Sequence, residues 1–341
     1  MRFSIGTFNV ENLVRANRPI YTEARARYSD GEYRDKVGWI RQQLVKMNAD
    51  IVGFQEVFEE EALRDCLAES PFAQWHLAVA SPTGKTPVNA LLSRYPLTGV
   101  EVIREIPFAF QFFDEARLAP FLENGAVDIP IRNFSRSLLK AVVRLNEDVS
   151  VVVFVVHLKS KRPIYPEGTD MDSVSYPEMA QGAVRSLVRR GIEAAGIRAL
   201  LSQEIDTDGQ RPVVIIGDLN DNDTAVTSQS ILGAPPFHKL PPEEKARRWK
   251  YVFQNCRDIQ ARKSLEHYHY TYIHNGHYES LDNIFVSNHF SDQNNDRLGR
   301  VIDLRLYNDH IIDKTVSRDR KPFYVSDHGQ VVVNMVLQER V

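Results

Sequence analysis

Short apolar runs, each about as long as a β-strand, recur along the whole chain and constrain its fold more than any other feature. They cover residues 3–8, 51–54, 75–80, 88–92, 138–145, 151–158, 213–216, 281–286 and 330–336. Runs of this length that are bounded by polar and turn-forming residues are typical of buried strands. We therefore expect a protein built on sheets, and 43% hydrophobic residues in 341 can supply one sizeable core.

Helical patterns lie between some of these runs. In the first, apolar residues recur at spacings of three and four: Val37, Ile40, Leu44 and Met47. A second helical pattern covers 59–67. The runs at 138–145 and 151–158 are joined by Asn-Glu-Asp at 146–148, which predicts a hairpin and hence an antiparallel pair. This disfavours a purely parallel doubly wound sheet, and two packed sheets with helices outside fit better.

One domain over residues 1–341 is expected, with insertions near 18–35, 161–205 and 235–250. The second insertion includes a predicted helix over 178–203 with four arginines: Arg185, Arg189, Arg190 and Arg198. The third carries a basic cluster: Lys245, Arg247, Arg248 and Lys250. Such segments are either rim elements beside an active site or solvated surface faces, and the sequence leaves both open.

Composition excludes several classes of protein. A net charge of −3, from 42 basic and 45 acidic residues, lacks the basic excess of a protein that coats nucleic acid, so any polyanion contact must be local. Cys66 and Cys256 stand far apart, which argues against a disulfide scaffold and a zinc site. The N-terminus shows no secretory signal, and the run 151–156 is too short to span a bilayer. We expect a soluble cytoplasmic protein without a membrane anchor.

Polar side chains gather where predicted strands end or begin. They are Asn9, Glu11, Gln55, Glu56, His157, Asp218, Asn220, Asp282, Asp327 and His328. Period-two alternation places Asn9 with Glu11, and Asp218 with Asn220, on a common face. We expect Gly217 to let the backbone approach a ligand closely. Carboxylate and amide oxygens suit a hard divalent cation, and an imidazole beside a carboxylate is a general acid/base device. Each segment alone is also compatible with a turn or a structural hydrogen bond.

Together and in order, these segments resemble the endonuclease/exonuclease/phosphatase superfamily. The motifs are Asn-x-Glu at 9–11, Gln-Glu at 55–56, His-Leu at 157–158, Gly-Asp-x-Asn at 217–220, Leu-Asp-x-Ile at 281–284 and Ser-Asp-His at 326–328. This superfamily includes pancreatic-type deoxyribonucleases, abasic-site endonucleases, neutral sphingomyelinases and inositol polyphosphate 5-phosphatases. The resemblance implies an α+β fold: a four-layer αββα sandwich in which two mainly antiparallel mixed sheets pack together, flanked by helices, with the site at one sheet edge.

The same resemblance implies ligands for metal and phosphate. Glu56 would be the principal metal ligand, and Asn9 would hold metal or phosphate. Glu11 stands where the family often has an Asp that joins a second metal, and Asp327 would lie near the metal. Arg136 resembles a phosphate-contacting Arg of some members. Oxygen ligands with few carboxylates suit Mg²⁺ or Mn²⁺ better than zinc.

The resemblance also implies catalytic roles. Asp218 would orient or deprotonate the attacking water, and Asn220 would hold the nucleophile or the scissile phosphate. His328, oriented by Asp282, would contact the phosphoryl oxygens. His157 would assist the leaving group. Because no Ser or Cys stands in a recognisable nucleophile setting, direct attack by water is favoured over a covalent intermediate.

Three classes of function follow. The leading hypothesis is a metal-dependent nuclease acting on DNA, favoured by the two histidines and by the basic segments at 185–198 and 245–250. The alternative is a phosphoesterase for a small molecule or lipid head group, of the phosphoinositide or sphingomyelin type. The third is a non-catalytic binding protein. No protein partner is evident, and the His- and Tyr-rich run 267–274 is compatible with base stacking or with an edge strand that packs its aromatics.

Overall fold

Two six-stranded sheets form the centre of the computed structural model, which describes residues 1–21, 27–113, 126–236, 239–264 and 269–338. The first sheet has the order β15-β16-β1-β2-β4-β3, with β1 (Arg2–Leu13), β2 (Ile51–Val57), β3 (His76–Val79), β4 (Val88–Ser93), β15 (Gly299–Tyr307) and β16 (Gln330–Leu337). The second has the order β11-β14-β10-β9-β8-β5, with β5 (Leu97–Glu105), β8 (Asn133–Arg144), β9 (Ser150–His157), β10 (Val213–Asp218), β11 (Gln254–Asn255) and β14 (Asp282–Val286).

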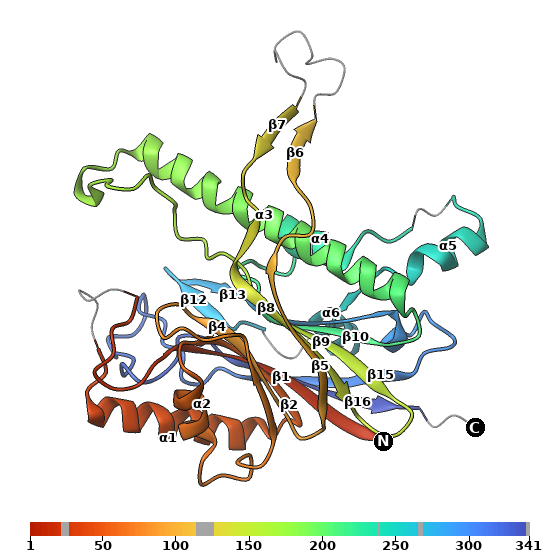
Figure 1. Ribbon diagram of the computed structural model, residues 1–341, viewed down its shortest axis with the longest axis horizontal. Coiled ribbons are helices and arrows are strands. Elements are labelled where there is room, and N and C mark those ends of the chain that lie inside the picture. Colours follow the sequence, from red (N-terminus) through yellow and green to blue (C-terminus); the bar gives the residue numbers. More distant parts are fainter. Residues whose placement is uncertain (22–26, 114–125, 237–238, 265–268, 339–341) are drawn as a thin grey trace.

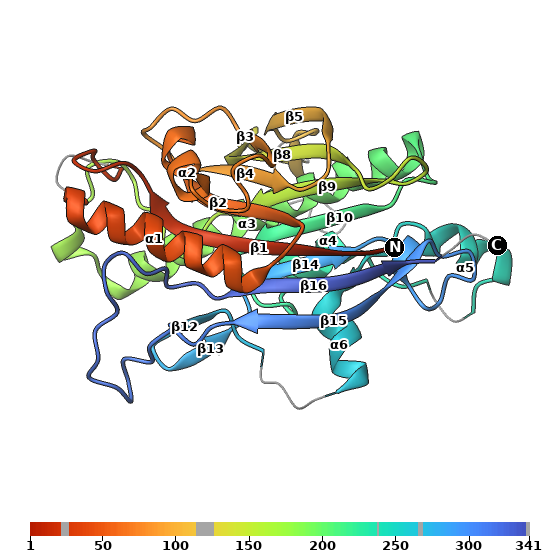
Figure 2. The ribbon, with the colours of Figure 1, turned by 90° about the horizontal axis from the view of Figure 1, so that it is seen from below.

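Helices cover the outer faces of both sheets, which gives four layers (Figures 1 and 2). The helices are α1 (Asp30–Met47), α2 (Glu60–Leu67), α3 (Tyr176–Thr207), α4 (Val226–Leu232), α5 (Pro242–Trp249) and α6 (Cys256–Lys263), with short 3₁₀ turns η2 (Met171–Ser173) and η3 (Asn288–Phe290). Figure 1 shows α1 below the first sheet and α3 above the second. Two further sheets have two strands each: β6 (Phe110–Phe113) pairs with β7 (Ala126–Ile129), and β12 (Tyr272–His274) pairs with β13 (His277–Glu279). The expected αββα sandwich is confirmed.

The run of valines in β9 shows why both sheet faces are apolar. Val151, Val153 and Val155 join the core between the two sheets, whereas Val152 and Val156 join a second core under α3. Alternate residues of a strand point to opposite faces, so a strand buried on both sides must be apolar throughout. The segment 176–207, placed by sequence within an insertion, thus supplies the helix that covers this sheet.

Strand direction brings the ends of four central strands together. Strands β1 and β2 are parallel, β9 and β10 are parallel, and the other pairings within the two sheets are antiparallel. The two sheets approach closely at Gly53, where an added Cβ would lie 2.6 Å from Ile216 Cδ1. The carboxyl ends of β1, β2, β9 and β10 therefore meet at one edge of the sandwich.

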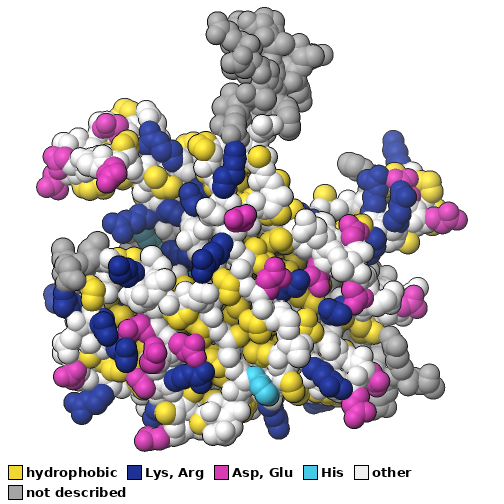
Figure 3. All heavy atoms as spheres, viewed as in Figure 1, with side chains coloured by type: hydrophobic (Ala, Val, Ile, Leu, Met, Phe, Trp, Pro, Cys, Tyr) yellow, Lys and Arg dark blue, Asp and Glu magenta, His cyan; other side chains and the backbone are white. Residues whose placement is uncertain are grey.

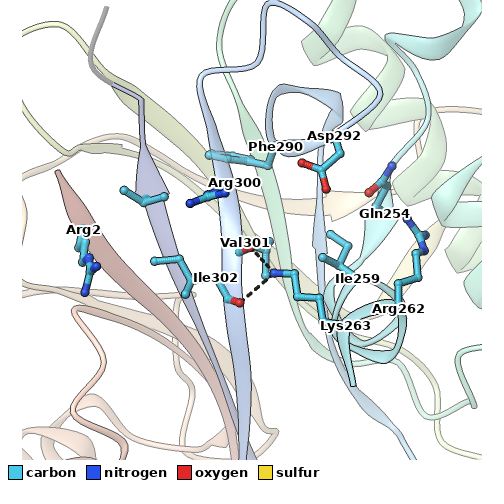
Figure 4. Close-up of a pocket in the computed structure, with 11 residues that line it drawn as sticks. Arg2, Gln254, Ile259, Arg262, Lys263, Phe290, Asp292, Arg300, Val301 and Ile302 are labelled. Atoms are coloured by element: carbon cyan, nitrogen blue, oxygen red, sulfur yellow. Dashed lines mark hydrogen bonds between the residues drawn. The ribbon is translucent and has the colours of Figure 1, made fainter. Parts of the chain in front are cut away.

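The edge strands β5 and β15 were missed by the sequence prediction. Most residues of β5 are exposed, and β15 alternates buried residues with charged ones. At β15 the Lys263 ammonium donates to the carbonyl oxygens of Val301 and Ile302, at 2.7 and 2.8 Å, where the register with β16 shifts (Figure 4). Lys263 thus occupies carbonyl oxygens that an edge strand would otherwise expose to pairing with another chain.

None of the helices in the described part of the chain is both long enough and apolar enough to cross a bilayer.

Candidate active site

One cavity of about 520 Å³ opens at the strand ends described above. Its lining includes most of the residues singled out from the sequence: Glu11, Glu56, Arg136, His157, Asp218, Asn220, Asp327 and His328. The other three are buried behind it: Asn9 contacts Asp218, Asp282 contacts His328, and Gln55 accepts a hydrogen bond from the Thr7 hydroxyl at 3.1 Å. Residues up to 319 positions apart in sequence therefore share one site. In Figure 3, Lys and Arg side chains gather around a hollow below the N-terminal half of α3.

Backbone register sets the neighbours of Asp218. In β10 it pairs with His157 of β9 and with Asp282 of β14. Gly217 permits this arrangement, because its φ is +146° and an added Cβ would lie 1.9 Å from the Val156 carbonyl oxygen. The glycine thus permits the close approach of two strands, and the sequence-based expectation that it lets the backbone approach a ligand stays a prediction.

The Asp218 carboxylate is the most connected group of the cavity. Its Oδ2 accepts a hydrogen bond from Asn9 Nδ2 at 3.1 Å, and its Oδ1 accepts one from the Asn220 backbone N–H at 2.7 Å. Burial raises its pKa to about 7, with the Asp282 carboxylate also raising it and the His328 charge opposing the shift. A carboxylate with such a pKa is poised to accept a proton near neutral pH.

His328 is held as an imidazolium between two carboxylates. Its Nδ1 lies 2.8 Å from Asp282 Oδ2, and its Nε2 lies 3.9 Å from Asp218 Oδ2. Burial lowers the pKa of His328, but the Asp282 and Asp218 carboxylates outweigh it and hold that pKa well above its usual value. The ring of Tyr272 lies 5.0 Å from the imidazole and covers it on one side. This side chain is a charged donor facing the cavity.

The pKa of His157 is shifted in the opposite direction. Burial, with the positive charges of Arg136 and His328, holds its pKa well below the usual value, so the ring is neutral at pH 7. Its Nε2 lies 3.3 Å from Asp218 Oδ2, yet neither ring nitrogen forms a hydrogen bond within the described residues. A buried imidazole without partners is costly, and a bound substrate or water would satisfy it.

Several strand-end residues have strained backbones. Glu11, Asn12, Glu56 and Asn220 all have φ between +50° and +65°. Non-glycine residues seldom adopt this conformation, and it costs of order 1–3 kcal/mol each. The turn at Glu56 places its carboxylate in the cavity, where Oε2 accepts the Asn12 backbone N–H at 3.0 Å and Oε1 has no hydrogen bond with a described residue.

Two groups of side chains could hold a cation. Ligand atoms of Asp218, Asp282 and His328 lie within 4.8 Å of one another. That group is already joined by the short His328–Asp282 contact, whereas Oε1 of Glu56 has no hydrogen bond among the described residues and lies 4.0 Å from His157 Nε2. The donor set therefore fits a metal at Glu56, which shares the neighbour His157 with Asp218.

Glu11 and Asp327 line the same cavity. Oxygen Oε2 of Glu11 accepts the Asp327 backbone N–H at 3.0 Å and also contacts the Lys321 ammonium. The charge of the buried Lys36 also acts on Glu11. Sequence reasoning missed both lysines, although one signal was available: Lys36 stands four residues before Ile40, on the buried side of α1.

Arg136 lines the cavity, with Nη1 donating to the Leu158 carbonyl oxygen at 3.0 Å and a buried Nε that has no hydrogen-bond partner among the described residues. The guanidinium is thus anchored at one end and can offer further donors to an anion.

The two basic segments singled out from the sequence are largely paired within the protein. In α3, Arg189 donates to Ser135 and the buried Arg190 pairs with Asp221 at 3.0 Å. In α5, Arg248 pairs with Glu244 at 2.7 Å. They therefore give less support to nucleic-acid binding than their sequence suggested. The Lys and Arg side chains that do line the cavity are Arg136, Lys161 and Arg162.

A second cavity, of about 540 Å³, lies near the start of β1, at the other end of that strand from Glu11 (Figure 4). Its lining combines Arg2, Arg262 and Arg300 with buried apolar residues, and it includes one carboxylate, Asp292, and no imidazole. It lacks the acid/base groups of the first cavity.

Comparisons with known structures agree with this fold. The crystal structure of humanized D. rerio TDP2 with 14 mutations matches at a TM-score of 0.55 and 14% identity, covering 98% of this chain and 99% of that one. Truncated Caenorhabditis elegans TDP2 matches at 0.55 and 13%, covering 98% and 97%. D. rerio TDP2 complexed with single strand DNA product matches at 0.52 and 13%, covering 98% and 99%.

A comparison with curated protein sequences gave no significant match. The sequence profile of the Endonuclease/Exonuclease/phosphatase family, however, matches residues 6–328, a range that includes every residue lining the first cavity. The resemblance inferred from the motifs is thereby confirmed, and the chain belongs to the endonuclease/exonuclease/phosphatase family.

Proposed function

We propose that this protein is a divalent-metal-dependent phosphodiester hydrolase that cleaves DNA by direct attack of water. The observation that carries the proposal is the position of Asp218. Its buried carboxylate is oriented by Asn9 and Asn220 and lies beside one neutral and one charged histidine in an open cavity. The family generally consists of metal-dependent phosphoric ester hydrolases, and the arrangement suits that chemistry.

Each of these side chains has its own role in the proposed reaction. Asp218, with a pKa of about 7, accepts the proton of the attacking water, and Asn220 keeps the carboxylate oriented. The His328 imidazolium and the Arg136 guanidinium donate to the phosphoryl oxygens. His157 is neutral, so its Nε2, 3.3 Å from Asp218 Oδ2, can take up the proton that Asp218 has accepted from water and deliver it to the leaving oxygen. Positioned acid/base groups of this kind contribute on the order of 10²–10⁴ in rate.

The metal would be held by Glu56, with Asn9 beside it. Mg²⁺ or Mn²⁺, when bound, polarises the phosphate and offsets its negative charge. Glu56 suits this role because one carboxylate oxygen is fixed by the Asn12 N–H and the other faces the cavity.

DNA is the proposed substrate because the rim of the cavity is cationic. Lys161 and Arg162 join Arg136 along it, above a floor of carboxylates. Lys161 is held by Glu279 at 2.5 Å, which leaves Arg162 more available to a phosphate backbone. Support also comes from D. rerio TDP2, which has this fold and was crystallised with a single strand DNA product.

The test is a substrate panel with Mg²⁺ or Mn²⁺: plasmid, single- and double-stranded oligonucleotides, a phosphoinositide and sphingomyelin. Cleavage of DNA that is lost in Asp218→Asn supports the proposal.

Arg162→Gln should raise KM for DNA and reduce the salt dependence of binding. Arg318→Gln, which alters an exposed arginine outside this cavity, should do neither. Hydrolysis of the small phosphoesters without cleavage of DNA would refute the nuclease assignment.

A further inference from the structure

The cavity of about 540 Å³ near the start of β1 is lined by four basic side chains, which three different elements supply. They are Arg2 of β1, Arg300 of β15, and Arg262 and Lys263 of α6, and Figure 4 shows them around the cavity. The chain as a whole carries a net charge of −3. Positive charge is therefore concentrated at this cavity, and such a concentration attracts anions.

Three of these basic groups have no counter-charge in the described part of the chain. No hydrogen bond or ion pair joins the guanidinium groups of Arg2, Arg262 and Arg300 to another described residue. Asp292, the carboxylate in the described lining, lies 3.7 Å from Arg297 Nη1 and is thus paired elsewhere. Guanidinium groups carry N–H donors whose geometry matches phosphate oxygens, so a phosphate-bearing ligand would satisfy these three side chains.

Strand register sets the spacing of two of the arginines. Arg2 and Arg300 are both paired with Val336, one on each side of β16. Residues that are paired across antiparallel strands point to the same face of a sheet, so the two arginines flank Val336 on one face. Two interstrand steps place their Cα atoms about 10 Å apart. At this spacing, two long side chains can reach different phosphate groups of one multivalent anion.

The rest of the lining suits the organic part of a ligand. Gln254 donates from Nε2 to Ser291 Oγ at 2.7 Å, and its Oε1 atom has no hydrogen bond with a described residue. This amide is therefore held in place with an acceptor to spare. The other lining residues are apolar: Ile259, Phe290, Val301, Ile302 and Val336. A ligand that fits this cavity combines phosphate groups with an apolar part that carries a hydrogen-bond donor.

We propose that this second cavity binds a free nucleoside phosphate. The arginines hold the phosphate groups, the apolar residues contact the base and sugar, and Gln254 Oε1 accepts a hydrogen bond from a base amino group. The volume of about 540 Å³ is in the range of about 300–1,000 Å³ that is usual for small-molecule sites. Those sites also combine apolar lining with a small number of placed polar groups, as this cavity does.

The proposed ligand is distinct from the phosphate group held in the first cavity. The two cavities share no lining residue. Strand β1 runs from Arg2 at one to Glu11 at the other, which at about 3.3 Å per residue places these positions roughly 30 Å apart. A single nucleotide cannot span this distance. The inference therefore does not rest on the proposed function.

The test is isothermal titration calorimetry on the whole chain in EDTA, with ADP as the probe. Wild type should bind ADP more tightly than pyrophosphate or adenosine, because each of these lacks one half of the recognised molecule. Arg2→Gln and Arg300→Gln should each raise the Kd for ADP at least about tenfold, since each removes charge-assisted hydrogen bonds to phosphate. Arg305→Gln is the matched control and should leave Kd unchanged, because Arg305 lies on the same strand as Arg300 but outside the cavity, beside Asp303.

Arg162→Gln alters the first cavity and should leave the binding of ADP intact. Binding that is lost in Arg162→Gln but kept in Arg300→Gln would place the nucleotide in the first cavity and overturn the inference. So would wild-type protein that binds no ADP at millimolar concentration, binds pyrophosphate as tightly as ADP, or binds only a single-stranded oligonucleotide. Circular dichroism establishes that each variant is folded. Hydrolysis of phosphodiesters with Mg²⁺ is measured separately, so none of these results decides the proposed function.

Discussion

The carboxylate of Asp282 lies 2.8 Å from Nδ1 of His328, although 46 residues separate the two in sequence. The contact fixes the orientation of the imidazole and stabilises its charged form. Asp218 pairs with Asp282 across β10 and β14. The same strand register therefore positions both the proposed general base and the carboxylate that stabilises the charged form of His328.

Replacing Asp218 with Asn should lower kcat by roughly 10²–10⁴, because the amide cannot accept a proton from water. The side chain keeps its shape, so the circular dichroism spectrum should not change. Steady-state hydrolysis of an oligonucleotide is the measurement. Activity equal to that of wild type would contradict the assignment of Asp218 as the base.

The charge on Asp218 should also affect stability. Its folded-state pKa of about 7 exceeds the ordinary value of 3.8, so the fold favours the protonated form. This contribution is fully present below about pH 4 and is lost as the pH rises through 7. Relative to wild type, Asp218→Asn should therefore be more stable at pH 8 than at pH 5, by on the order of a few kcal/mol. Urea unfolding in EDTA at both pH values measures the difference, and an equal difference at the two would argue against it.

Asp282→Asn should shift the alkaline limb of the kcat profile to lower pH. The Asp282 carboxylate raises the pKa of His328, so without it the imidazolium loses its proton earlier. A profile of kcat against pH for wild type and variant makes the comparison. Asp296→Asn, at an exposed loop carboxylate, serves as control and should leave the profile in place.

Gly217→Ala should destabilise the protein by roughly 3 kcal/mol or more, since the new methyl group would collide with the Val156 carbonyl oxygen at a positive φ. Gly191→Ala in α3 is the matched control. Its Cβ would meet nothing within 4 Å, and alanine favours a helix by up to about 1 kcal/mol. Denaturant unfolding of both variants tests the pair, and comparable stabilities would show that the glycine is dispensable.

Chelation by EDTA should abolish phosphodiester hydrolysis, and added Mg²⁺ or Mn²⁺ should restore it. In Glu56→Gln the metal concentration for half-maximal activity should rise at least tenfold, as is usual when a carboxylate near a metal is altered. Activity that survives exhaustive chelation would speak against a role for the metal.

The sequence already indicated many of the residues that line the candidate site. Each central strand is apolar along its length and changes to carboxylates, amides or imidazoles where it ends, and this local pattern located Asn9, Glu56, Asp218 and His328. The sequence analysis did not predict the edge strands β5 and β15, because one side of each is exposed to solvent and their composition is therefore polar. The sequence analysis identified the arginines of α3, but it did not identify the residues with which they pair.

What the sequence determined by itself is therefore the set of strands with buried faces and the chemistry at their ends, since both depend on residues adjacent in the chain. Tertiary structure alone decided which charged groups interact: Lys321 contacts Glu11 across 310 positions, and the charge of Lys36, buried in α1, acts on the same carboxylate. Electrostatic interactions depend on distance through space and on burial, and neither is encoded in the local spacing of residues.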